Sequence, residues 1–399
     1  MKYTYLFFLV LVLASCSSEE NTLYKIDPRT FVENEITLSD IADDIKYVPL
    51  DNRITFINFN YVITTGFIYI STKNNAILKF DRQGNLIRKI GNKGRGPDEF
   101  LYGLEFTVDE RSGTVYIFDP HKIIVYSANG TFLRDILLDK IAGGIGWDGG
   151  DIAIFNSLLF IPNSLGFGDS KYAWAFLDTM GNLITTKGNS VPPFQTNAGR
   201  DARVYKFENK LCYFNYFNDT IFSISSDLSY RSEYIFAKGD HRWPKTGITV
   251  GSIAESNAQI YKLFDPGTVF ETNHFLVLQY GYLDRSAICF INKKSKKTFL
   301  AFKLDESPTQ YIRVRKYTIN LINDLDGGIP LERLNYYYEN DKEYLTSLID
   351  PLDLKTYTSS NEFIHTTPKY PEKKKELEKL AASLKETDNP VLVFVRLKN

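Results

Sequence analysis

Residues 68–100 read IYISTKNNAILKFDRQGNLIRKIGNKGRGPDEF. The stretch holds three short apolar runs, at residues 68–71, 76–81 and 86–91, and polar turn residues around Gly84 and Asn85 separate the last two. Runs of this length with period-two alternation predict β-strands, and glycine and asparagine supply the positive φ that a tight hairpin needs. The stretch therefore predicts a small antiparallel meander.

The same pattern recurs about 47 residues later and is then repeated further along the chain. Further copies follow at residues 115–136, 158–184, 210–236 and 275–302, and a degenerate sixth copy combines 319–324, 334–339 and 344–348. One such sheet cannot bury both of its faces alone, whereas a radial arrangement packs consecutive sheets face to face. The chain is therefore predicted to be an all-β, six-bladed β-propeller of four-stranded antiparallel blades. Seven blades is the alternative, because the spacing stretches late in the chain.

Two strand-like segments, 45–50 and 391–397, are left over from the blade count. Pairing a strand from one end of the chain into a blade made by the other end would remove exposed sheet edges and close the ring. Before the second segment, residues 371–386 have the pattern of an amphipathic helix that begins at Pro371. This short C-terminal helix is expected on the outer rim, with partner binding as the alternative.

The first residues of the chain have the pattern of an export signal. Lys2 precedes an apolar run at residues 6–14, which is too short to anchor a protein across a bilayer. The sequence Leu13-Ala14-Ser15-Cys16 resembles a bacterial lipobox, in which the cysteine is acylated and becomes the mature N-terminus. Several acyl chains on one residue give stable anchoring. An ordinary cleaved signal with a chance cysteine is the alternative.

These patterns divide the chain into three parts. Residues 1–15 are predicted to be a lipoprotein signal peptide, residues 16–36 a lipidated tether that begins at Cys16, and residues 37–399 a single propeller domain.

The tail of the opening stretch resembles a known repeat. Residues 91–100 follow the pattern Gly-x-x-Gly-x-Gly-Pro-x-Glu-Phe and look like the end of an NHL repeat. From residues 38–50 to residues 389–395, the chain is similar to the six-bladed β-propeller lipoproteins of gut-type Gram-negative bacteria. The resemblance implies an outer-membrane lipoprotein whose membrane partner is reached through the lipid anchor. Residues 17–20 resemble the acidic tag of surface lipoproteins and favour the cell surface over the periplasmic face.

Composition excludes some partners. The chain is 43% hydrophobic and 24% charged with a formal net charge of −1, so nothing favours binding to nucleic acid. Its 26 Tyr and 29 Phe fit a β-rich protein. Cys212 and Cys289 each lie inside an apolar run and are expected to pack as small hydrophobic residues, with a disulfide as the alternative.

No motif in the chain specifies a reaction. The chain has four isolated histidines, His121, His241, His274 and His365. Their spacing matches no zinc motif, so neither a metal nor a cofactor is predicted. The glycines of residues 91–96 lack the Lys-Ser/Thr of a phosphate-binding loop and fit a connection between blades. No Gly-x-Ser-x-Gly elbow of a serine hydrolase is present.

Three aspartates, Asp81, Asp119 and Asp178, each end a strand before a turn. Aspartate in this position commonly bonds its own backbone. Their repetition indicates a structural role, because catalysis needs an asymmetric set of unlike groups.

Insertions that interrupt the blade rhythm are the candidate binding loops, because loops converge at the channel mouth of a propeller. They lie at residues 143–150, 191–205 and 239–253. The candidate ligand-binding residues in them are Trp147, Arg200, Arg203, His241 and Trp243. An aromatic ring beside charged groups suits a sugar or a peptide. The alternatives are core packing for each tryptophan and surface salt bridges for the arginines.

The leading hypothesis is a non-enzymatic, lipid-anchored binding module for a nutrient, glycan, peptide or partner protein, accessory to an outer-membrane uptake complex. One alternative is an NHL-type propeller lyase or hydrolase that uses a channel-mouth histidine with carboxylates or a metal. It requires a histidine and carboxylates that converge on one point. The other alternative is a purely structural scaffold, which would lack a concave site at the channel mouth.

Overall fold

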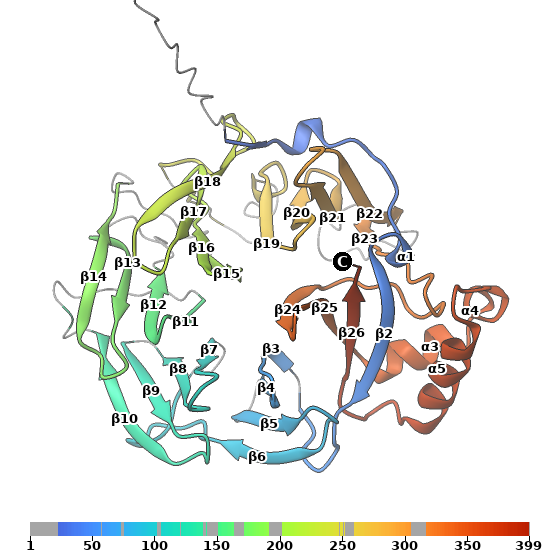
Figure 1. The fold of residues 1–399 in the computed structure, drawn as a ribbon, viewed down its shortest axis with the longest axis horizontal. Helices are drawn as coiled ribbons and strands as arrows, with labels where there is room; N and C mark the ends of the chain where they lie inside the picture. Colours follow the sequence, from blue (N-terminus) through green and yellow to red (C-terminus); the bar gives the residue numbers. More distant parts are fainter. Residues whose placement is uncertain are drawn as a thin grey trace, which may run out of the picture.

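The fold is an all-β propeller, as predicted, and is seen here in a computed structural model. The structure describes residues 23–56, 58–72, 76–101, 105–119, 121–138, 141, 151–162, 171–190, 202–246, 248–249, 251, 259–304 and 317–398. Within these residues the strands form six sheets around a central axis (Figure 1). Each sheet contains a four-stranded antiparallel unit, and the strands nearest the axis are β3, β7, β11, β15, β19 and β24.

The first three sheets are regular four-stranded blades. Blade 1 contains β3 (Asn58–Ile63), β4 (Phe67–Thr72), β5 (Ile77–Asp81) and β6 (Leu86–Ile90); blade 2 contains β7 (Phe106–Val108), β8 (Val115–Asp119), β9 (Lys122–Tyr126) and β10 (Phe132–Leu137); blade 3 contains β11 (Ala153–Phe155), β12 (Leu158–Pro162), β13 (Tyr172–Leu177) and β14 (Leu183–Gly188). The predicted copies supplied three runs each, so the innermost strands β3, β7 and β11 are additions to them.

The next three sheets contain additional strands or a strand from the other end of the chain. Blade 4 contains β15 (Arg203–Phe207), β16 (Lys210–Phe214), β17 (Thr220–Ile224), β18 (Tyr230–Phe236) and the added β1 (Lys25–Ile26); blade 5 contains β19 (Asp265–Glu271), β20 (Phe275–Tyr282), β21 (Arg285–Asn292), β22 (Thr298–Leu304) and the added β23 (Tyr317–Ile319); blade 6 contains β24 (Asn335–Glu339), β25 (Lys342–Ile349), β26 (Val391–Leu397) and β2 (Ala42–Pro49).

The ring closes in blade 6 as the leftover segments predicted. Strand β2 is the outermost strand of this blade and pairs antiparallel with β26, with Tyr47 opposite Val393. One predicted part of the sixth copy is wrong. Residues 319–324 do not belong to blade 6, because Ile319 ends β23 and pairs with Phe302 in blade 5.

The N-terminal segment lies against the propeller over residues 23–36. Strand β1 adds in parallel to β18, with Lys25 opposite Ile235, and the side chain of Ile26 is fully buried. The 3₁₀ helix η1 (Pro28–Thr30) follows, and Val32 N then donates to Thr298 Oγ1 of blade 5 at 2.8 Å. Helix α1 (Leu38–Ile41) leads into the closing strand β2. This packed course runs along blades 4 and 5 and is blue in Figure 1.

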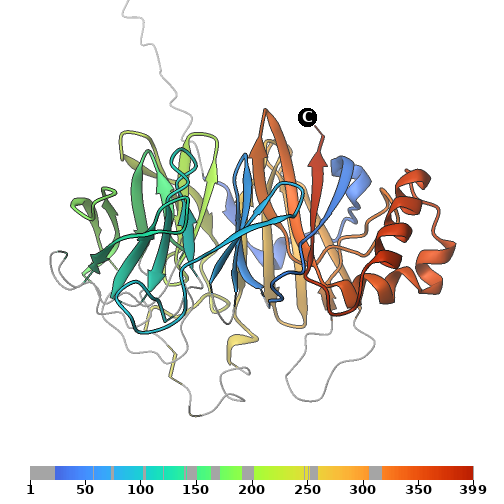
Figure 2. The same cartoon turned by 90° about the horizontal axis from the view of Figure 1, so that it is seen from below.

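Three helices lie outside blade 6, where they project from the side of the propeller (Figure 2). They are α3 (Pro351–Thr358), α4 (Asn361–His365) and α5 (Pro371–Ser383), all between β25 and β26. Helix α5 is the predicted helix, three residues shorter at its C-terminus, and its start matches the preference of proline for the first helical turn. It buries Leu377 and Ala381, and Lys373 Nζ contacts Asp44 Oδ1 of β2 at 2.6 Å. No helix among the described residues is long and apolar enough to cross a membrane.

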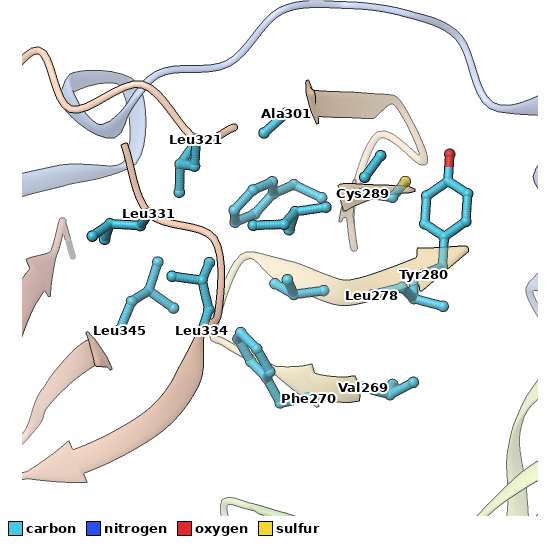
Figure 3. Packing of buried hydrophobic residues seen from close by; sticks show 14 of the residues in the cluster. Val269, Phe270, Leu278, Tyr280, Cys289, Ala301, Leu321, Leu331, Leu334 and Leu345 are labelled. Carbon is cyan, nitrogen blue, oxygen red and sulfur yellow. The ribbon is translucent and has the colours of Figure 1, made fainter. Parts of the chain in front are cut away.

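Apolar side chains fill the spaces between neighbouring blades. The largest cluster spans blades 4 to 6 and includes Phe270, Leu278 and Leu345 (Figure 3). Cys212 and Cys289 are fully buried free cysteines, which confirms the prediction that they pack as small hydrophobic residues. Burial raises the pKa of the Cys212 thiol to about 12, so this thiol is unreactive at neutral pH.

The repeated aspartates have the structural role that was predicted for them. Asp81 Oδ1 accepts hydrogen bonds from the backbone N–H groups of Gln83 and Asn85, both at 2.9 Å. Asp178 makes the corresponding bonds in blade 3. Asp119 instead accepts from Leu101 N at 3.0 Å and so fixes the connection between blades 1 and 2.

The glycine-rich segment 91–100 is a connection between blades, as predicted. Gly94 N donates to Phe100 O at 3.0 Å, and Phe100 N donates to Asn92 O at 3.1 Å. A Cβ atom on Gly94 would lie 1.9 Å from Glu99 Oε2, so a larger residue there would require the Glu99 side chain to move. The buried Phe100 ring joins the core between blades 1 and 2.

Candidate functional site

Six turns ring one end of the central axis and form the part of the molecule that we call the hairpin mouth. Each turn joins the innermost strand of a blade to its second strand, and the blades repeat around the axis, so these turns lie at the same end. The turns are residues 64–66, 109–114, 156–157, 208–209, 272–274 and 340–341.

Several of these turns are two residues long and have the geometry of tight hairpins. Asn156 and Ser157 have φ values of 49° and 62°, and Asn340 and Asp341 have values of 50° and 58°. Positive φ at both central residues matches the twist of the flanking strands. The short turns therefore place polar side chains at the mouth on a stiff framework.

Hydrogen bonds between neighbouring blades hold the hairpin mouth together. They run from Thr65 N to Glu110 Oε1 (2.8 Å), from Asn156 Nδ2 to Ser226 O (3.1 Å), from Tyr205 OH to Glu271 Oε1 (3.2 Å), from Asn273 N to Glu343 Oε1 (2.8 Å) and from Arg82 Nη2 to Glu339 Oε2 (3.1 Å). These bonds fix the positions of the turns relative to one another.

Two hollows open at the hairpin mouth. One has a volume of about 370 Å³ and lies among the inner strands and turns of blades 1 to 3, with Lys206 from blade 4. The other has a volume of about 430 Å³ and lies between β11 and β15, reaching Ser226. Ile154, Asn156 and Lys206 line both, so the two hollows meet at these side chains.

Lys206 is the central charged group of the hollows. It lies on β15 one residue before the end of the strand, and its side chain is exposed although protein surrounds it. Desolvation lowers the pKa of the Lys206 ammonium, and the nearby carboxylates of Glu110 and Asp109 act in the opposite direction. Within the described part of the chain, no hydrogen bond or ion pair engages Lys206 Nζ.

The neighbouring charged groups are mostly engaged. Glu110 Oε1 accepts from both the backbone N and the hydroxyl of Thr65. Asp109 Oδ2 accepts from Ser112 Oγ at 2.7 Å, and Lys210 Nζ pairs with Glu233 Oε1 at 3.1 Å. Lys206 therefore differs from Asp109, Glu110 and Lys210 in having a head group that is available to a ligand.

A buried carboxylate lies beside the mouth in blade 5. Glu271 is 3% exposed and accepts from Tyr234 OH at 2.8 Å and from Lys293 Nζ at 3.0 Å, in addition to Tyr205. Burial, followed by the charge of Glu271, raises the pKa of Tyr234 far above its ordinary value. This network is hydrogen-bonded throughout and joins blades 4 and 5.

Arg203, one of the predicted ligand residues, takes part in interactions between blades. It begins β15, at the opposite end of the strand from the hairpin mouth. Its Nε donates to Gly267 O at 3.1 Å, and its Nη1 lies 3.5 Å from Asp151 Oδ1. This matches the salt-bridge alternative considered for Arg203.

His241 and Trp243 are both 2% exposed. The Trp243 ring packs edge-on against Tyr216, with the centroids 5.7 Å apart, which matches the core-packing alternative. Burial, followed by the charge of Arg29, lowers the pKa of His241. As placed, neither side chain is open to a ligand.

Trp147, Arg200 and Cys16 lie outside the described residues. A ligand role for the predicted residues, and lipidation of Cys16, stay predictions.

The four histidines lie apart from one another. His274 is exposed in a turn of the hairpin mouth, and His121 directly precedes β9. His241 is buried near blade 4, and His365 is the last residue of α4. Among the described residues, no group of three or more His, Cys, Asp or Glu side chains could hold a metal ion.

Sequence reasoning missed Lys206 because it missed the innermost strands. Residues 203–205 were assigned to an insertion and residues 206–207 to no element, whereas Arg203–Phe207 is the inner strand of blade 4. Alternation within this strand was the available signal, since Lys206 lies between the buried residues Tyr205 and Phe207 and therefore points from the opposite face of the sheet, where it lines the hollows.

The chain is similar in fold to solved structures. A Bacteroides fragilis protein described as exported shares 16% identity with it at a TM-score of 0.62, over 92% of this chain and 99% of that chain. A duf4221 family member from Bacteroides vulgatus shares 13% identity at a TM-score of 0.46, over 92% of this chain and 99% of that chain. Virginiamycin B lyase from Staphylococcus aureus shares 13% identity at a TM-score of 0.38, over 76% of this chain and 95% of that chain.

A search of curated proteins finds no match to the chain. The family model described as domain of unknown function DUF4934 matches residues 23–396, which is nearly all of the chain. Together with the propeller fold of the described residues, this match assigns the family. The chain belongs to the DUF4934 family.

Proposed function

We propose that the protein is a lipid-anchored binding module of the bacterial cell envelope and that the hairpin mouth is its ligand site. The observation that supports this function is the pair of hollows that meet at Lys206. Their volumes are in the range typical of small-molecule sites, and their walls supply backbone, hydroxyl, amide and charged groups. A saccharide or a short peptide segment is the class of ligand that fits such walls.

The hairpin mouth favours binding over catalysis. Its carboxylate Asp109 is bonded by Ser112 of the same turn, and Glu110 is bonded by Thr65 of the neighbouring turn. General acid–base catalysis needs a pair of groups that reach a common reacting atom. His274, the exposed histidine of the mouth, belongs to blade 5, and the residues that line the two hollows come from blades 1 to 4.

The envelope location rests on the leader sequence. The apolar run before Cys16 and the resemblance of residues 13–16 to a lipobox support export and lipidation. The similar fold of a Bacteroides fragilis protein described as exported agrees with that location. The cell surface is the proposed side of the outer membrane, and an accessory role in an uptake complex is the proposed context.

Ligand screening by calorimetry tests the proposed site. The mature protein would be screened against saccharides and short peptides, and each hit would be repeated with Asn156→Ala, which alters the wall shared by both hollows. Weaker binding to the variant is expected. Binding that Asn156→Ala leaves unchanged would move the site away from the hairpin mouth, and the absence of any ligand would favour the scaffold alternative.

Isolation of the native protein from outer membranes tests the anchor. Mass spectrometry should find acyl chains on Cys16, and Cys16→Ala should leave the protein unanchored. Co-purification of a transporter with the native form alone would support the accessory role in uptake.

A further inference from the structure

We infer that the hairpin mouth recognises a carboxylate group, which binds over Lys206 where the two hollows meet. This inference rests on the proposed function, because it names the chemical class of ligand for the same site.

The position of Lys206 is the first argument. Lys206, Asn156 and Ile154 line both hollows, so a ligand that extends from one hollow into the other must pass Lys206. The side chain projects from an inner strand and not from a long loop, and strands hold a binding group more precisely than loops do.

The second argument is which charged side chains of the walls have no partner. The charged side chains that line the hollows are Asp109, Glu110, Arg111, Lys206, Glu208 and Lys210. Within the described residues, the heads of Asp109, Glu110 and Lys210 have hydrogen-bond or ion-pair partners. The three remaining heads are the cations Arg111 and Lys206 and the carboxylate Glu208, so two of the three heads without such a partner can bind an anion.

The surroundings of Lys206 favour a singly charged anion. Glu110 and Asp109 interact electrostatically with the Lys206 ammonium and would repel an anion, the more strongly if it carried two charges. A phosphate monoester carries nearly two negative charges at neutral pH, whereas a carboxylate carries one. The exposed Ser157 hydroxyl in the same wall can donate a further hydrogen bond to a carboxylate oxygen.

The same chemistry has two sources, a sugar acid and the C-terminus of a peptide. Both place a carboxylate beside hydroxyl or amide groups, which the polar walls of the hollows can bond. The probes must therefore include one matched acid and neutral pair from each source.

The test uses lysine side chains carrying ¹³C-methyl groups and observed by NMR. The Lys206 signal is identified by its absence from Lys206→Arg. Glucuronate is compared with glucose, and trialanine with trialanine amide, each at millimolar concentration. The Lys206 signal is expected to shift with at least one acid and to shift much less with its neutral counterpart.

Affinity measurements with variants complete the test. Lys206→Gln should weaken binding of that acid by about tenfold or more, because it removes a charge-assisted hydrogen bond. Lys206→Arg should retain part of the affinity, and Lys89→Gln, an exposed lysine on β6, should change nothing. Unchanged unfolding curves would show that each variant folds.

Three results would overturn the inference. They are equal shifts with acid and neutral probes, an acid that binds Lys206→Gln as tightly as the natural chain, and no shift of Lys206 with either acid. If a neutral ligand bound Lys206→Gln and still lost affinity in Asn156→Ala, the proposed function would stand and the inference alone would fail.

Discussion

The two halves of the ring differ at their outer edge. In the described part of the chain, blades 1 to 3 end at single edge strands, β6, β10 and β14. Blades 4 and 5 carry the added strands β1 and β23, and helices α3 to α5 flank blade 6. The apolar residues Ile87, Leu133 and Ile184 are exposed on the bare edges, whereas Ile26 is fully buried where β1 covers blade 4.

The cores of the two halves differ in the same way. One continuous cluster joins blades 4, 5 and 6 with the N-terminal segment and the helices. Around blades 1 to 3, each junction has a separate cluster of its own. A blade therefore forms from the repeated strands alone. In blades 4 to 6, where the two ends of the chain meet, the added segments join the cores of neighbouring blades into one cluster.

The largest effect is expected from a charge in the closing pair of strands. Val393→Asp would bury a carboxylate in the large core cluster, at a fully buried position of β26, the strand between β2 and β25. An unpaired buried charge should cost more than about 4 kcal/mol, so the variant should not fold. Circular dichroism and yield of soluble protein measure the effect. Ile184→Asp on the bare edge of blade 3 is the matched control and should fold normally; equal damage from both would remove the contrast between the halves.

A smaller loss is expected where the N-terminal strand covers blade 4. Ile26→Ala removes a fully buried side chain from β1 and should lower the free energy of unfolding by about 2–4 kcal/mol. Ile87→Ala, on the bare edge of blade 1, should change it by less than about 0.5 kcal/mol. Urea unfolding of both variants measures the difference. A negligible effect of Ile26→Ala would mean that the N-terminal segment adds no stability.

Carboxylates that link neighbouring blades should also contribute more stability in blades 4 to 6 than in blades 1 to 3, although the difference should be smaller. Glu271→Gln leaves Lys293 without its buried charged partner in blade 5 and should lower the free energy of unfolding by about 1–3 kcal/mol. Glu110→Gln weakens an exposed link between the turns of blades 1 and 2 and should cost less than about 1 kcal/mol. Urea unfolding again measures both. A larger loss from Glu110→Gln would contradict the comparison.

The comparison also explains how far the sequence could predict the molecule. The regular runs of blades 1 to 3 and the closing strands were predicted because alternation and turn residues are local signals. Strands β7 and β11 were missed because they are three residues long and too short to show a period. Helix α3 was missed because its residues, PLDLKTYT, show no clear apolar stripe.

The candidate site lies on inner strands that the sequence analysis did not predict. Lys206 could be recognised as a residue of the hollows only after β15 was placed as an inner strand. Likewise, the burial of Trp243 against Tyr216 follows from a long-range contact that no local pattern encodes. Local periodicity therefore predicts blades, whereas the site depends on which strand lies nearest the axis.

The smallest expected effect is a difference in how the two halves respond to pH. In the covered half, burial raises the pKa of Asp326, whose Oδ1 accepts hydrogen bonds from Asn323 Nδ2 at 2.7 Å and Gly328 N at 2.9 Å. In the turn of blade 3, a side-chain hydrogen bond from Asn182 lowers the pKa of Asp178. The folded state therefore binds a proton more tightly than the unfolded state at Asp326 and less tightly at Asp178.

These opposite shifts give opposite slopes of stability against pH. The contribution of Asp326 is present below the ordinary carboxyl pKa and is lost as the pH rises through its raised pKa, by at most about 1.4 kcal/mol per pH unit. The contribution of Asp178 is present above the ordinary pKa and is lost as the pH falls through its lowered value. Urea unfolding from about pH 3 to about pH 7 should therefore show that Asp326→Asn gains stability relative to the natural chain as the pH rises, whereas Asp178→Asn loses it. Parallel curves for the two variants would mean that burial beneath the added segments does not control the Asp326 carboxyl.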